Sequence, residues 1–195
     1  MLLGIGGSHG TGKTTHIHGS LPNLVAESIY PFSLILADNC IEYVNGDHKR
    51  NIVWKGARQG KVAMLSDMIR DDSTLYVVEG SWVWRPGALL GDLGLVAQEC
   101  GGGYEMLYAV ADGPTMIRFI KDRCIKVGKA YSTSWDTRAE YESHTRCENA
   151  AKKHLLPYNV PYKFYYISYN RLEWDAIDGE LWGYMKRPAA DWYGG

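Results

Sequence analysis

The 195-residue sequence has little cysteine, little excess charge and no long apolar segment. Its four cysteines, Cys40, Cys100, Cys124 and Cys147, are widely spaced and form no C-x-x-C pair. This pattern excludes both a disulfide framework and a zinc site as the basis of the fold. We therefore expect reduced thiols and a cytoplasmic protein.

The charges nearly balance, with 21 Lys and Arg against 22 Asp and Glu and a formal net charge of -1. Such a balance is not that of a protein that coats nucleic acid or binds membranes through a polybasic surface. No apolar stretch has the length of a membrane span, and residues 1–6 are too short for a signal peptide. We expect no membrane partner, and the length predicts a single domain over residues 1–195.

The most specific pattern is Gly-Ser-His-Gly-Thr-Gly-Lys-Thr at residues 7–14, which matches G-x-x-x-x-G-K-[ST] and directly follows a short apolar run. Glycines allow successive backbone N–H groups to turn toward phosphate oxygens. Lys13 is expected to reach the β- and γ-phosphates, and the Thr14 hydroxyl to bind Mg²⁺. The helix that begins after the loop favours an anion at its N-terminus. The residues predicted to contact ATP here are Gly7, Ser8, His9, Gly10, Thr11, Gly12, Lys13, Thr14 and Thr15.

Segments of strand and helix character alternate along the chain, which predicts an α/β fold with a parallel five-stranded sheet flanked by helices. The strands are expected at 2–5, 33–37, 74–78, 104–111 and 162–169, and the helices at 13–20, 52–70, 88–100, 114–127, 136–155 and 175–185. In such a sheet the ligand binds beyond the carboxyl ends of the strands. The residues that follow each strand are therefore the candidates for chemistry.

Two acids follow predicted strands. Glu79 ends the third strand, where a carboxylate organises Mg²⁺ or its waters in phosphate-loop proteins; the alternative is a solvated carboxylate at a strand end. Asp38 follows the second strand and is placed to act as a general base on an acceptor hydroxyl. An Asx-turn or a helix cap formed by the Asp38-Asn39 pair explains this aspartate equally well.

Two further groups are candidates for binding. Trp82, Trp84 and Arg85 follow Glu79 and are suited to stacking on an acceptor ring and pairing with its phosphate or carboxylate, although they also fit a half-buried stretch of chain. Asn170 and Arg171 follow the last strand, where side chains often cover the edge of adenine. That assignment rests on position alone.

A cationic segment contains Arg118, Lys121, Arg123, Lys126 and Lys129. Cations on a closing flap stabilise the charge that develops on a transferred phosphoryl group. A solvated basic helix face is the alternative. The Gly- and Ser-containing residues 128–135 favour a mobile lid, which we place at about 118–138.

The phosphate loop, Glu79-Gly80 after the third strand, and the Asp112-Gly113-Pro114 turn before an arginine-bearing helix together resemble the phosphate-loop (P-loop NTPase) kinase superfamily of nucleoside monophosphate and deoxynucleoside kinases. The resemblance implies strand order 2-3-1-4-5, a helical lid whose arginines, Arg118 and Arg123, clamp the phosphates, and a role for Asp38 at the acceptor hydroxyl.

The third strand ends in Glu-Gly-Ser, so the acceptor-binding arginine that usually follows it is missing and Arg85 is the candidate replacement. The lid arginines are also more widely spaced than is usual in those families. In loop and size the chain is also similar to phage kinases that phosphorylate 5-hydroxymethyluracil in DNA. That similarity makes DNA an alternative acceptor and the host cytoplasm an alternative location.

The expected function is transfer of the γ-phosphate of ATP, with Mg²⁺, to a hydroxyl or phosphate of a small nucleoside-like acceptor. The rival is a nucleotide-hydrolysing switch or binding module. A GTPase needs Asn-Lys-x-Asp to read guanine and Asp-x-x-Gly after the third strand. Neither pattern occurs in that form.

Overall fold

The computed structural model describes residues 2–53, 58–69, 73–80 and 104–167, together with Trp174, Ala176, Ile177, Gly179 and Gly183. The predicted helix at 88–100 lies outside these residues, as do Trp82, Trp84, Arg85, Asn170 and Arg171. Of the predicted helix at 175–185, the four described residues are helical.

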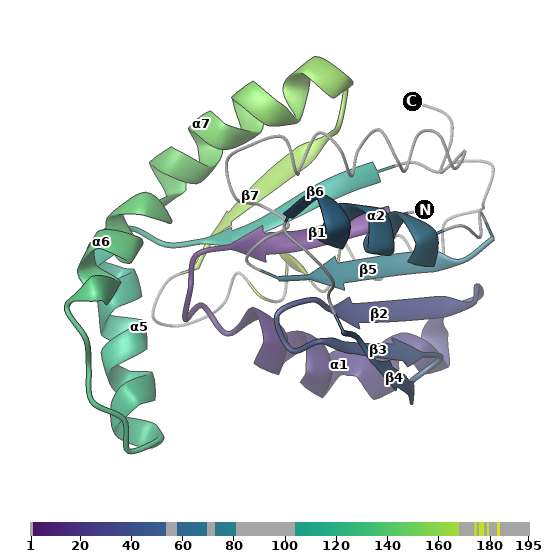
Figure 1. The fold of residues 1–195 in the computed structure, drawn as a ribbon, viewed down its shortest axis with the longest axis horizontal. Helices are drawn as coiled ribbons and strands as arrows, with labels where there is room; N and C mark the ends of the chain where they lie inside the picture. Colours follow the sequence, from purple (N-terminus) through teal and green to yellow (C-terminus); the bar gives the residue numbers. More distant parts are fainter. Residues whose placement is uncertain are drawn as a thin grey trace.

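The described strands form one mixed sheet of seven strands in the order β4-β3-β2-β5-β1-β6-β7 (Figure 1). Neighbours pair in parallel from β2 through β5, β1 and β6 to β7, whereas β3 and β4 pair antiparallel. The α/β class is confirmed, but the prediction of a wholly parallel sheet of five strands is wrong. The strands are β1 Leu2–Gly7, β2 Phe32–Leu36, β3 Ile41–Val44, β4 Asp47–Asn51, β5 Leu75–Glu79, β6 Tyr104–Val110 and β7 Tyr162–Tyr166.

The two additional strands form a hairpin that extends the sheet beyond β2. Its turn contains Asn45 and Gly46, both with positive φ (49° and 90°), and Asn-Gly at such a turn is among the strongest hairpin signals in a sequence. The Asn45 Oδ1 atom also accepts a hydrogen bond from the Phe32 N–H at 2.9 Å, which ties the turn to β2. Residues 52 and 53, the first two of the helix predicted at 52–70, are not helical, and the described helix in this segment spans Arg58–Met68.

The helices cover both faces of the sheet. Their bounds are α1 Lys13–Glu27, α2 Arg58–Met68, α5 Gly113–Lys126, α6 Ser134–Tyr141 and α7 His144–His154, with a short 3₁₀ helix at Leu156–Tyr158. The first helix does not end near Ser20 as predicted but continues past Pro22. Proline inside a helix costs about 3 kcal/mol, and packing of Val25 against the core helps to offset that cost.

Successive side chains of the buried strands point to opposite faces of the sheet, so the clusters that they join show which helices cover each face. On β1, Leu3 and Ile5 face the cluster that contains Ile17 of α1 and Phe119 of α5. Leu2, one residue away, faces the opposite cluster, which contains side chains of α2 and α7. A strand buried on both faces reads as a continuous apolar run, which is why these strands were predictable.

The helix predicted at 136–155 is two helices, because the chain leaves helical geometry at Ser143 (φ −62°, ψ 156°). Serine in extended geometry before a helix is a preferred N-cap residue type. Glu142 is the residue that follows the last residue of α6. Helices α5 and α6 lie near the carboxyl ends of the parallel strands (Figure 1).

The described part of the chain has no helix that is both long and apolar enough to cross a membrane. Cys40, Cys124 and Cys147 are free thiols, as predicted, and Cys100 lies outside the described residues.

Candidate functional site

The loop at residues 7–14 joins the end of β1 to the start of α1. Gly7, Gly10 and Gly12 have φ values of 121°, 81° and 88°, which side chains other than glycine rarely tolerate. A Cβ on Gly7 would lie 2.0 Å from the Ala109 carbonyl oxygen of β6. The neighbouring Ser8 N–H donates to that same oxygen at 2.9 Å. These glycines are thus required by the close contact between the loop and β6 and by the turn itself.

The Lys13 side chain lies across the loop, and only 7 % of the residue is exposed. It donates to the Ser8 carbonyl oxygen at 2.7 Å and to the Gly7 carbonyl oxygen at 3.4 Å. Burial lowers the pKa of Lys13, while the negative charges of Glu79, Glu142 and Asp38 oppose that shift. An ammonium has three N–H donors, so these two carbonyls leave one donor for a ligand.

Glu79 meets the loop from the end of β5. The Thr14 hydroxyl donates to Glu79 Oε2 at 2.9 Å, and the Glu79 side chain is buried. Burial raises the pKa of Glu79, and the nearby Lys13 charge and the Thr14 hydrogen bond oppose the rise. The alternative of a solvated carboxylate is wrong. A hydroxyl and a carboxylate oxygen side by side are the hard donors that Mg²⁺ prefers.

A cavity of about 760 Å³ opens above the loop. Its walls come from the loop, from the turn after β2, from the end of β5 and from the second half of α5. The lining residues are His9, Gly10, Gly12, Lys13, Thr14, Thr15, Asp38, Asn39, Glu79, Phe119, Asp122, Arg123, Lys126 and Val127. The structure thus brings the predicted loop, both predicted acids and one of the two predicted arginines to one cavity.

Asp38 is exposed and lines this cavity. It lies in a turn over residues 37–40, which is closed by the Cys40 N–H and the Ala37 carbonyl at 3.4 Å. Because strand β3 follows the turn, the helix-cap alternative is wrong. Asp38 therefore belongs to the turn after β2 and also lines the cavity, so its place in the turn leaves a role at an acceptor open.

The predicted lid, residues 118–138, corresponds to most of α5, a connecting loop and the start of α6. Arg123 lines the cavity, whereas the exposed Arg118 does not. The connecting loop is held at Tyr131, whose hydroxyl donates to Asp136 Oδ1 at 2.5 Å. That hydrogen bond raises the pKa of Tyr131 to about 12. The Lys121 ammonium lies 5.1 Å from the centre of the same ring.

His9 occupies a variable position of the loop pattern but contacts residues that the sequence did not single out. Its ring stacks on Trp135 with centroids 4.7 Å apart. Burial lowers the pKa of His9 to about 4, and the positive charges of Arg138, Lys13 and Arg123 add to the shift. The imidazole is therefore neutral at pH 7, and the charged groups around His9 are three cations together with the carboxylates of Asp38 and Glu142.

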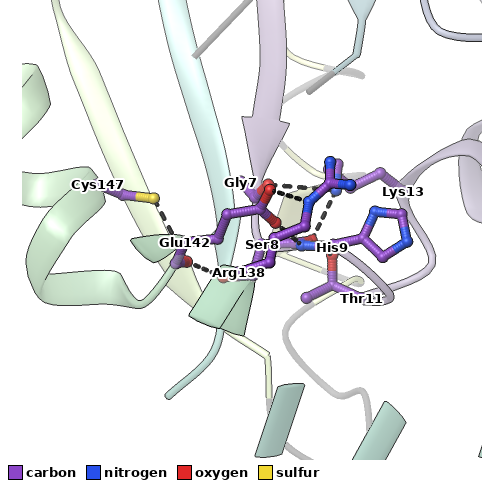
Figure 2. A network of polar contacts seen from close by, with 8 residues as sticks. All are labelled: Gly7, Ser8, His9, Thr11, Lys13, Arg138, Glu142 and Cys147. Carbon is purple, nitrogen blue, oxygen red and sulfur yellow. Dashed lines mark hydrogen bonds and ion pairs between the residues drawn. The ribbon is translucent and has the colours of Figure 1, made fainter. Parts of the chain in front are cut away.

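Three other residues near the loop, Arg138, Glu142 and Trp174, were not anticipated. Glu142 and Arg138 form an ion pair beside the loop, as Figure 2 shows. The buried Trp174 donates its indole N–H to the Thr11 carbonyl at 3.3 Å and stacks on His16. Nothing in the linear spacing indicates that Glu142 or Trp174 meets the loop, because the Glu142–His9 and Trp174–Thr11 contacts each join residues more than 100 positions apart.

A scan against known protein families found no family that matches this chain, and a search of curated proteins found no matching sequence. The geometry of the site therefore carries the functional argument.

Proposed function

We propose that this protein is an ATP-dependent kinase with a P-loop NTPase fold and a helical lid, and that it transfers the γ-phosphate to a hydroxyl or phosphate of a small nucleoside-like acceptor. The observation that carries the proposal is the contact between Thr14 and Glu79 at the foot of a cavity that also holds Lys13. These three groups are what a bound nucleoside triphosphate and its metal ion require.

The arrangement of the strands supports the fold assignment. Numbered along the chain, the strands with parallel pairing run β2-β5-β1-β6-β7, which is the order 2-3-1-4-5 implied by the resemblance to phosphate-loop kinases. The cavity lies at the carboxyl ends of β1, β2 and β5, the expected place for a ligand of such a sheet.

In this proposal the loop amides and the Lys13 ammonium hold the β- and γ-phosphates, and Thr14 with Glu79 would hold Mg²⁺. The metal ion, when bound, neutralises charge on the phosphate oxygens. Arg123 faces the same cavity and is placed to stabilise the transferred group. The remaining volume beside Asp38 is the proposed acceptor site.

For a hydroxyl acceptor, Asp38 takes the hydroxyl proton as the acceptor oxygen bonds to the γ-phosphorus. The bond from that phosphorus to the β,γ-bridging oxygen breaks, and ADP leaves with its electron pair. A phosphate acceptor is already ionised and needs no base. A nucleotide switch needs no base for an acceptor hydroxyl, so the place of Asp38 at the cavity wall favours a kinase over a switch.

The test is incubation with γ-labelled ATP and Mg²⁺ and a panel of nucleosides, nucleoside monophosphates and hydroxymethylated DNA. We expect label on one acceptor class and loss of transfer in Lys13→Met. Asp38→Asn should lose activity only if the acceptor group is a hydroxyl. ATP hydrolysis without a labelled acceptor, or transfer that survives Lys13→Met, would contradict the proposal.

A further inference from the structure

Glu142 is a buried acid outside the predicted site, with only 2 % of the residue exposed. A buried carboxylate is costly unless both of its oxygens find partners. Here Oε2 accepts the His9 backbone N–H at 2.7 Å, and Oε1 accepts the Arg138 Nε–H at 2.7 Å. One carboxylate therefore joins the phosphate loop to helix α6.

The backbone of Glu142 makes a second connection to the loop. Its carbonyl oxygen accepts a hydrogen bond from the Ser8 hydroxyl, with the two oxygens 2.7 Å apart (Figure 2). The Ser8 Oγ atom in turn accepts the Ala111 N–H at 2.9 Å. Two consecutive loop residues, Ser8 and His9, are thus held by the one residue that ends α6.

The face of α6 that bears Arg138 also covers the His9 ring. Trp135 stacks on that ring, and the Arg138 guanidinium lies 5.4 Å from the centre of the Trp135 ring. Trp135 and Arg138 are three residues apart and share one face of the helix. The direction of the guanidinium is therefore fixed on two sides, by Trp135 and by Glu142.

We propose that Glu142 is a positioning residue for the phosphate loop: it fixes the His9 amide, and with it the direction of the loop amides that follow, and it holds Arg138 near His9, a residue of the cavity wall. Gly10 comes next, at a φ of 81°, so rotation of the peptide before His9 would change the path of the loop into its phosphate-binding amides. The Arg138 ion pair offsets the negative charge of Glu142, which would otherwise oppose an anion nearby. This inference rests on the proposed nucleotide site.

The test compares three variants in equilibrium binding of MgATP. Glu142→Gln keeps the length but removes the charge, and Glu142→Asp keeps the charge but shortens the reach between its two partners. Both should weaken binding about tenfold or more, since small displacements of positioning groups have effects of this size. Glu140→Gln, an exposed glutamate on the same helix, is the matched control and should bind as the wild type does.

A merely structural role predicts lower thermal stability with unchanged affinity of the folded protein, and that result in both Glu142 variants would overturn the inference. If either variant fails to fold, NMR of the His9 amide in the wild-type protein tests the inference. The His9 amide should exchange slowly and resonate downfield because it donates to a carboxylate. Rapid exchange of that amide would overturn the inference. If the wild type does not bind MgATP, the proposed function fails instead.

Discussion

Lys13 and Glu79 are the two buried charges on which the account depends. Burial lowers the pKa of Lys13 and raises the pKa of Glu79, which in both cases favours the neutral form. The opposite charge of the partner opposes each shift. Such groups are costly to bury, but they are already in place when a charged ligand arrives, and that preorganisation is a main source of electrostatic catalysis. Their burial is easier to explain by ligand binding than by stability.

His9 gives a test at a single residue. Its imidazole should titrate with a midpoint at about pH 4 in the ligand-free protein, because burial and three nearby cations disfavour the charged ring. The unfolded chain takes up this proton near pH 6.5, so the histidine should lower stability as the pH falls from 6.5 toward 4. NMR of the ring protons measures the midpoint, and a value near 6.5 would contradict the packing against Trp135.

The sequence identified the loop and Glu79 because their chemistry lies in a contiguous pattern or directly after a strand. It did not identify Glu142, Arg138 or Trp135. Trp135 and Glu142 contact His9 across more than 100 residues of sequence, and a local pattern carries no information on such contacts. Ser143, a residue type common directly before helices, was a signal of the break between α6 and α7, although its side chain makes no capping hydrogen bond.

At the scale of elements, the junction of β1 with the loop depends on glycine at position 7. Gly7→Ala should destabilise the protein by about 2–5 kcal/mol, because the residue has positive φ and its new Cβ would clash with the Ala109 carbonyl. Gly19→Ala is the control, since a Cβ added there in α1 would meet no atom of the described residues within 4 Å beyond its own helix backbone, and a gain of about 0.5–1 kcal/mol is expected. Urea unfolding measures both changes. Equal stability of the two variants would contradict the loop geometry.

The two arginines of α5 should differ. Arg123 lines the cavity and Arg118 does not, so Arg123→Ala should lower kcat by roughly tenfold or more while Arg118→Ala stays near the wild type. Loss of a transition-state contact lowers kcat more than it raises KM. Steady-state kinetics with the identified acceptor tests this. A larger effect at Arg118 would mean that a different face of the helix meets the phosphates.

The core strands and most helices could be predicted because continuous apolar runs mark the strands and Gly and Pro residues mark the ends of elements. The β3–β4 hairpin was missed although Asn45-Gly46 signals it, because Asp47–Asn51 is a fully exposed polar strand without an alternating apolar face. The end of α1 was misplaced because Gly19 and Pro22 are breakers by propensity. Tertiary packing overrides propensity there.

At the scale of the whole molecule, charge bears on the choice between a small acceptor and DNA. The net charge is -1, and the cavity cations Arg123 and Lys126 lie beside Asp122. A protein that meets 6–10 DNA phosphates loses about 10³–10⁵ in affinity between 50 and 200 mM salt. We expect only a shallow dependence for hydroxymethylated duplex DNA, and little for the matching nucleoside. Tight, steeply salt-dependent duplex binding with phosphate on the DNA would establish DNA as the acceptor.

The central claim is that the loop at residues 7–14 binds a nucleoside triphosphate with its metal ion. Calorimetric titration of the wild-type protein with MgATP, beside Lys13→Met, tests it most directly. The account predicts measurable wild-type binding and a weakening of about tenfold or more, or about 1.4 kcal/mol, in the Lys13→Met variant, which remains folded. No binding by the wild type, or equal binding by the two proteins, would contradict the account.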